Sequence, residues 1–119
     1  MIRRTAAIAA VLSLAAGLAG CADMVTGGPL LRPGEPTGVI RVTNATGDQL
    51  HAVLISNCDA STYGLNRLPS GMAIPPGGSY DFTVSAGCWD VDAGTFGVGE
   101  ARQRMHVDAG GGVDYTVTR

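Results

Sequence analysis

Three aspartates, Asp81, Asp90 and Asp92, come nearest in type and spacing to a metal site. A calcium ion takes roughly six to eight oxygen ligands, often from several carboxylates in one loop. No Asp-x-Asp-x-Asp-Gly run occurs in the sequence, and Asp90 and Asp92 are spaced as neighbours on one face of a strand. The pattern therefore favours solvated surface charges, with these three aspartates as the candidate ligands for a divalent cation.

The two histidines, His51 and His106, are the residues that could activate a nucleophile. Such catalysis needs a histidine beside a serine or cysteine and a carboxylate that orients it. Both histidines fall in segments predicted as strands, whereas catalytic groups cluster on loops, and no Gly-x-Ser-x-Gly motif is present. The glycines at 110–112 precede a predicted strand instead of a helix, so they are not a phosphate-binding loop. We expect a protein that is not an enzyme and carries no cofactor.

The segment 57–70 is the longest stretch without strand or helix periodicity. Long loops in small domains are commonly functional or disordered. This one contains Tyr63, Asn66 and Arg67, and both tyrosine and arginine are enriched at binding hot spots. Alternatively, the leucines of the same segment pack it onto the domain. Tyr63, Asn66 and Arg67 are therefore the candidate partner-binding residues.

From Val39 onward the chain divides into short segments that alternate apolar and polar residues, the period of β-strands. The predicted strands cover residues 39–44, 49–56, 79–85, 88–93, 100–108 and 113–118, with a possible short seventh strand at 72–74. The segment 49–56 has apolar residues on both faces, which favours a central strand. The glycines at 110–112 predict a hairpin turn between the last two strands.

These segments predict an all-β fold without helices. A single sheet of this composition would leave an apolar face in water, so two packed sheets are expected. We predict a small antiparallel β-sandwich of six or seven strands, immunoglobulin-like or transthyretin-like. Trp89, which alternates with polar neighbours in its strand, is predicted to lie near the centre of the core.

The stretch Leu18-Ala19-Gly20-Cys21 ends an apolar run that follows Arg3 and Arg4, the arrangement of a secretory signal. The 16 residues from Thr5 to Gly20 are fewer than the roughly 20 apolar residues that a membrane-spanning helix needs. The stretch resembles the lipobox of bacterial lipoproteins. This resemblance implies that residues 1–20 are a signal peptide removed before Cys21, and that Cys21 carries acyl chains that anchor the protein to the bilayer.

Without that leader, the chain keeps six arginines and all ten acidic residues, a formal net charge of −4. The phosphates of a nucleic acid would repel such a domain, so no nucleic-acid partner is expected. Assigning Cys21 to lipid leaves Cys58 and Cys88 as an even pair in an exported protein, which favours a disulfide. A metal-binding or reactive thiol pair is disfavoured because the Cys-x-x-Cys spacing is absent.

The expected organisation has three parts: the signal peptide at 1–20, an acylated cysteine with a proline- and glycine-rich tether at 21–38, and a sandwich domain at 39–119. Proline-rich linkers extend by about 3.1 Å per residue. The tether is therefore predicted to be a spacer that holds the domain up to roughly 50 Å from the bilayer.

The domain also resembles a group of small exported bacterial β-sandwich proteins without an assigned activity. They share a strand ending in Asn-x-Thr/Ser-Gly, an aromatic-Gly loop, a Pro-Gly turn and a Cys-aromatic-Asp strand. The corresponding segments here lie between Val39 and Val91: 41–47, 53–56, 63–68, 74–77 and 88–91. The resemblance implies a β-sandwich and transfers no catalytic residue.

The expected function is that of a non-enzymatic envelope lipoprotein, a membrane-tethered sandwich for protein binding or structural support. Its expected partners are the lipid bilayer, through acylated Cys21, and an envelope protein. In enterobacterial lipoproteins, aspartate directly after the acylated cysteine favours the inner membrane. The residue here is Ala22, so we expect the outer membrane, facing the periplasm. The alternative is a small ligand- or divalent-ion-binding periplasmic lipoprotein.

Overall fold

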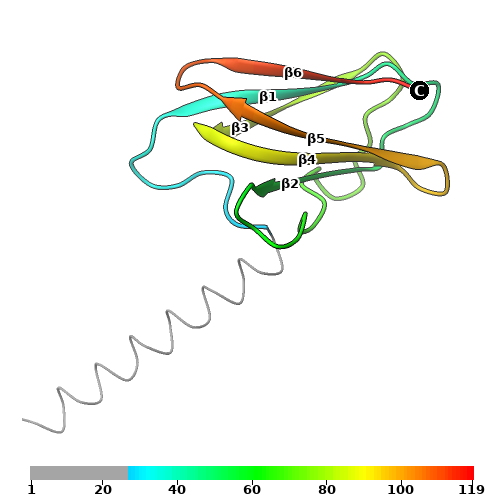
Figure 1. Ribbon diagram of the computed structural model, residues 1–119. Coiled ribbons are helices and arrows are strands. Elements are labelled where there is room, and N and C mark those ends of the chain that lie inside the picture. The colour runs from blue at the N-terminus through cyan, green and yellow to red at the C-terminus, as the bar shows by residue number, and fades with distance from the viewer. Residues whose placement is uncertain (1–26) are drawn as a thin grey trace, which may run out of the picture.

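The computed structural model describes residues 27–119, which form an all-β domain of two three-stranded sheets packed face to face (Figure 1). This confirms the predicted small β-sandwich. The predicted signal peptide and Cys21 lie outside the described residues, so cleavage and acylation stay predictions. Within residues 27–119, no helix has the length and apolar character needed to span a membrane.

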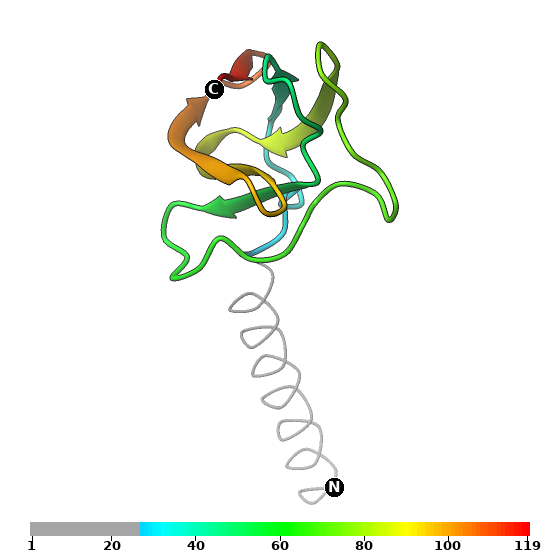
Figure 2. The same ribbon diagram turned by 90° about the vertical axis from the view of Figure 1, so that its right-hand side faces the viewer.

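Six strands form the two layers, as the alternation of apolar and polar residues predicted. One sheet has the order β3-β1-β6 and the other the order β2-β4-β5. Figure 2 shows the two layers from the side. The strands are β1 (Thr37–Asn44), β2 (Ala52–Asn57), β3 (Ser79–Ser85), β4 (Gly87–Thr95), β5 (Gly99–Val107) and β6 (Gly112–Val117).

The pairing of β6 differs from the predicted hairpin. β6 belongs to the other sheet from β5 and pairs with β1 in parallel, with Val42 opposite Tyr115. The remaining strand pairs are antiparallel. The glycines at 110–112 make a turn that crosses between the layers, where Gly110 has a φ of 72° and its N–H donates to Thr37 O at 2.8 Å. The turn therefore changes sheets instead of reversing the chain within one.

The two predictions around β2 are also corrected. β2 lies at an edge of its sheet and β4 at the centre. Residues 72–74 form no strand, only an isolated bridge between Ile74 and Leu50. Leu50 is fully buried before β2 begins, and Leu54 meets Asn66 from the long loop. The apolar residues on both faces of this segment thus reflect covering by loops, not a central position.

The core lies between the layers and confirms the inward-facing residues predicted for most strands. Trp89 is fully buried, and its Nε1 donates to Ser85 O at 2.8 Å. The buried apolar residues include Ile40, Val42, Val53, Ile55, Phe82, Val84, Val91, Met105, Val107 and Tyr115. The predicted disulfide is present: Cys58 is bonded to Cys88 with a Cα–Cα distance of 5.6 Å. It fixes the start of the long loop to β4.

Residues 27–36, which we call the strap, pack against the domain. Gly27 O accepts from Asn57 N at 3.1 Å, and Ser85 N donates to Leu30 O at 2.8 Å. The Arg32 guanidinium lies 5.2 Å from the centroid of the Trp89 ring. This corrects the expectation of a free spacer for residues 27–36, because several of their backbone groups are hydrogen-bonded to the domain.

Candidate functional site

The outer face of the β2-β4-β5 sheet carries two rows of side chains placed by the strand register. Leu54, Asp92 and Arg102 are directly opposite one another, and the next row is Ala52, Gly94 and Glu100. Residues opposite one another on neighbouring strands have Cβ atoms about 4.5–5.5 Å apart. The register therefore brings two carboxylates and one guanidinium together from β4 and β5.

Asp92 is the buried member of this group, with 2 % of its surface exposed. Arg102 Nε donates to Asp92 Oδ2 at 3.2 Å, and its Nη2 donates to Glu100 Oε1 at 2.8 Å. Asp92 Oδ1 is buried and has no hydrogen-bond partner. Burial, and then a hydrogen bond between the protonated carboxyl and Glu100 and the charge of Glu100, raise the pKa of Asp92 to about 6 against the opposing effect of Arg102. A buried carboxylate of this kind is costly to ionise.

Tyr63 of the long loop also contacts Arg102. The guanidinium lies 4.8 Å from the centroid of the tyrosine ring, a cation–π contact. The hydrogen bond to Asp92 is the main cause that raises the pKa of Arg102, so this side chain stays charged. Tyr63 thus contributes to the site through Arg102, a role that the sequence did not reveal.

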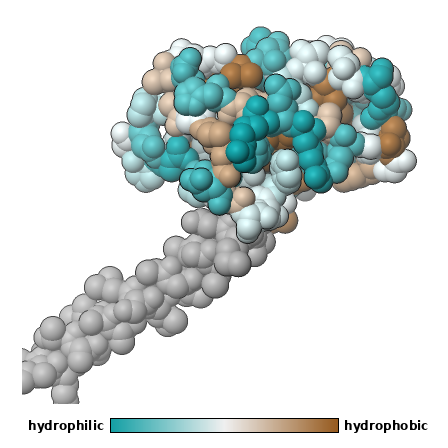
Figure 3. Space-filling view, in the orientation of Figure 1, coloured by the Kyte–Doolittle hydropathy of each residue, from teal (hydrophilic) through white to brown (hydrophobic). Residues whose placement is uncertain are grey.

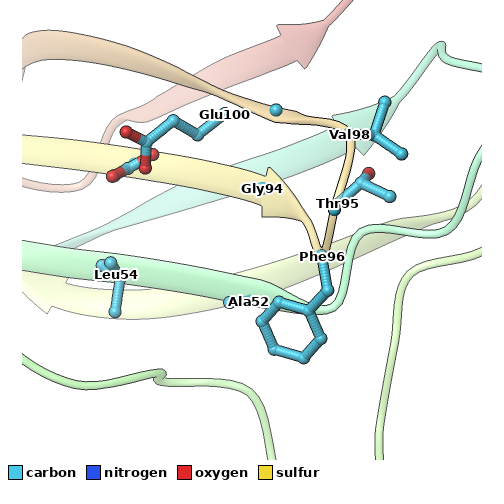
Figure 4. A pocket seen from close by; sticks show the side chains of 10 residues that line it. Ala52, Leu54, Gly94, Thr95, Phe96, Val98 and Glu100 are labelled. Atoms are coloured by element: carbon cyan, nitrogen blue, oxygen red, sulfur yellow. The ribbon is translucent and has the colours of Figure 1, made fainter.

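A groove of about 470 Å³ opens beside Asp92 and Glu100, which we call the acidic pair (Figure 4). Gly94 leaves its floor without a side chain between Ala52 and Glu100, which are its partners in the register. At its end lies the turn between β4 and β5, residues 96–98; with the flanking strand ends Thr95 and Gly99 we call it the hairpin tip. The groove therefore combines an apolar wall with a carboxylate edge.

Two large apolar side chains of the hairpin tip are exposed, Phe96 at 72 % and Val98 at 54 %. The Phe96 ring stacks on His51 with centroids 4.9 Å apart and an interplanar angle of 8°. In addition, Phe96 N donates to His51 Nδ1 at 3.2 Å. Figure 3 shows hydrophobic surface at the end of the domain where this turn lies. Stacking on His51 holds an exposed aromatic ring in a defined position.

The predicted partner residues Asn66 and Arg67 bind the protein's own backbone. Asn66 Oδ1 accepts from Val53 N at 2.9 Å. Arg67 Nη2 donates to Ile55 O at 2.9 Å and to Gly28 O at 2.6 Å. These bonds join the long loop to β2 and to the strap. A partner contact by Asn66 or Arg67 stays a prediction, beside this structural role.

The three candidate metal ligands do not meet. Asp81 lies on β3 in the other sheet and receives two hydrogen bonds from Arg41, at 2.7 and 3.0 Å. Asp90 receives two from Arg104, at 2.9 and 3.0 Å. Of the three, Asp92 alone lines the groove. Residues 27–119 contain no group of three or more His, Cys, Asp or Glu side chains arranged to hold a metal ion.

Phe96, Val98 and Glu100 were not predicted as site residues from the sequence. The available signal was Thr95-Phe96-Gly97-Val98-Gly99, in which two large apolar residues alternate with glycines in a turn. Turns are normally polar, so apolar residues there indicate a contact surface. No protein-family model matches the chain, and a search of curated proteins finds no significant match.

Proposed function

We propose that this protein is a non-enzymatic, lipid-anchored domain of the bacterial cell envelope that binds another protein through its hairpin tip and the adjoining groove. The binding role is supported by the exposure of Phe96, the most exposed large apolar side chain of residues 27–119, together with Val98 in the same turn. Leu31, Leu65 and Met72 are the other large apolar side chains exposed within these residues. Exposed aromatic residues on a positioned turn are typical of binding surfaces.

The anchor in this proposal is Cys21, whose lipobox resemblance supports acylation and a place on the outer membrane, facing the periplasm. The Cys58–Cys88 disulfide agrees with an oxidising compartment. Because two or more acyl chains hold a protein stably at a bilayer, the domain would meet its partner at the membrane surface.

The hairpin tip is favoured over the long loop as the contact surface. Within the loop, Asn66 and Arg67 bind backbone groups and Tyr63 stacks on Arg102. A partner would have to displace these contacts. Phe96 and Val98 present their apolar surface directly. Among residues 27–119, no observation favours the divalent-ion alternative, because Asp81 and Asp90 each receive hydrogen bonds from an arginine.

The test is site-specific photo-crosslinking in intact cells. We expect benzoylphenylalanine in place of Phe96 to give a discrete cross-linked product that mass spectrometry identifies as one protein. The matched control replaces Thr83, an exposed residue on β3 of the other sheet. Equal cross-linking from both positions would contradict a binding surface at the hairpin tip. Loss of fatty-acid labelling in a Cys21→Ser variant tests the anchor separately.

A further inference from the structure

When both are ionised, the two carboxylates of the acidic pair carry two negative charges but are bonded to one positively charged side chain. Asp92 and Glu100 share a single guanidinium, which bonds one oxygen of each carboxylate. When both carboxyls are ionised, this leaves Asp92 Oδ1 buried without a donor, beside a groove that Asp92 and Glu100 both line; when Asp92 is protonated, a hydrogen bond to Glu100 satisfies it instead. Buried carboxylate oxygens are normally hydrogen-bonded. A second cation would complete the site.

We propose that Asp92 and Glu100 bind the ammonium group of a lysine side chain presented by the protein partner. This inference rests on the proposed function and names the chemistry of its partner. The lysine stem would lie against Ala52 and Leu54, and apolar neighbours of the lysine would pack on Phe96. These three residues and both carboxylates line the same groove.

A lysine fits this arrangement better than other cations. The groove joins an apolar wall to an acidic edge, which matches a side chain with an apolar stem and a charged head. An ammonium group is a compact point charge, whereas a guanidinium binds best to two acceptors placed to match its planar fork. Arg102 already occupies one oxygen of each carboxylate in this way. A calcium ion needs more oxygens than two carboxylates supply. The acidic balance of the chain beyond its leader also favours a basic partner.

The ammonium group can reach Asp92 through movement of Glu100. The Glu100 side chain is half exposed, so it can rotate without disturbing the core. Gly94, its cross-strand partner, offers no side chain to block that rotation. A Cβ built at Gly94 would lie 3.4 Å from the Glu100 Cβ, so even alanine there would occupy part of this space.

The electrostatics of Asp92 agree with this geometry. Burial and Glu100 raise its pKa, and Arg102 only partly opposes them. The other titratable groups around the site are Tyr63, which contacts Arg102, and Tyr115, whose own pKa is raised by burial and then by Asp92. A bound ammonium would favour ionised Asp92 and so lower its pKa.

The experiment measures peptide binding by NMR, using protein purified from envelopes in detergent. The probe is acetyl-Leu-Lys-Leu-amide, and its matched control carries norleucine, which lacks the charge. We expect the lysine peptide to bind at least about tenfold more tightly at pH 7.5. This preference should disappear in Glu100→Gln, whose half-exposed position preserves the fold, and in Asp92→Asn. It should persist in Asp81→Asn on the other sheet.

Each contrary result has a defined meaning. Equal binding of both peptides, or no binding of either, overturns the lysine site but leaves cross-linking from position 96, and so the proposed function, intact. If the pKa of Asp92 stays near 6 with the lysine peptide bound, Asp92 and Glu100 only share a proton, and the lysine site is also overturned. Calcium chloride that competes with the peptide at millimolar concentration would indicate a metal site instead. Loss of cross-linking from position 96 would contradict the proposed function itself.

Discussion

The outer faces of the two sheets use the same residue types with opposite results. On the β3-β1-β6 sheet, Asp81 pairs with Arg41 in the solvent, and this hydrogen-bonded pair lowers the pKa of Asp81. On the β2-β4-β5 sheet, Asp92 also pairs with an arginine, yet its pKa is raised. An aspartate–arginine pair therefore does not determine the electrostatics of a face by itself.

Burial and a second carboxylate explain why the pKa of Asp92 is raised while that of Asp81 is lowered. Asp92 loses its hydration and has Glu100 beside it, whereas Asp81 remains about half exposed with a guanidinium of its own. The Arg41–Asp81 pair between β1 and β3 contributes to solubility and little else. The group on β4 and β5 keeps an unsatisfied charge next to a groove, which is the condition for binding a further cation.

The largest test removes the core on which both faces depend. Trp89→Ala should lower the free energy of unfolding by about 3–5 kcal/mol, because it leaves a cavity between the sheets. Urea denaturation measures the loss, and Thr83→Ala is the surface control. A loss below about 1 kcal/mol would contradict the buried position of the indole.

The second test releases the loop that carries Tyr63 over Arg102. Replacing both Cys58 and Cys88 with serine should cost roughly 3.5 kcal/mol, because the disulfide closes a loop of about thirty residues in the unfolded chain. The freed loop should also hydrate Asp92 and lower its pKa, as followed by NMR titration. An unchanged pKa would show that the strands alone bury the carboxylate.

The third test removes the charge of Asp92. Asp92→Asn keeps an acceptor for Arg102 but no longer has to ionise, so it should stabilise the protein by on the order of 2 kcal/mol at pH 7.5. Thermal and urea unfolding measure the gain, and Asp90→Asn, which loses an ion pair, is the control that should not stabilise. Destabilisation by Asp92→Asn would contradict the costly ionisation of this carboxyl group.

The pH dependence of that gain has a defined sign. The folded pKa of Asp92 is raised to about 6, above the value of about 3.9 expected when unfolded. Between these two pKa values the folded state binds more protons than the unfolded state. The contribution of wild-type Asp92 to the free energy of unfolding therefore falls as pH rises. The advantage of Asp92→Asn should therefore be absent below about pH 4 and complete above about pH 7. A gain that does not vary with pH would have another cause.

The smallest effect is expected on the other face. Asp81→Asn should reduce stability slightly at low ionic strength, because the pair with Arg41 is exposed. In about 1 M salt, where screening acts over roughly 3 Å, the difference from wild type should vanish. A loss that persists in high salt would mean that the two faces differ less than their burial indicates.

The sequence predicted the strands themselves better than which strands pair with one another. Alternation identified the strands and the burial of Trp89, since side-chain period is a local property. The predicted disulfide between Cys58 and Cys88 is confirmed, whereas the assignment of Cys21 to lipid, from which that pairing was argued, stays a prediction. The parallel pairing of β6 with β1 was not predictable, because the local pattern of a strand does not specify which strand lies beside it.

The site needed the register as well as the elements. Asp92 was predicted to be a solvated surface charge, and that prediction is wrong: the residue is buried, with Leu54 and Arg102 directly opposite it on the neighbouring strands. Glu100 and Asp92 are eight positions apart in sequence and meet only because β4 and β5 form a hairpin. The importance of Phe96 follows from its exposure, which composition alone does not give.

Docking of the strap on the domain shortens the linker that could separate the domain from the bilayer. With Cys21 acylated as proposed, six peptide links would join Cys21 to Gly27, the first of the described residues that is hydrogen-bonded to the domain. Fully extended, six links reach about 20 Å, less than half of the spacing that a free tether through Gly38 would give. On this proposal the accessible partners would be confined to a thin layer at the membrane surface, which would favour other membrane proteins over freely diffusing ones.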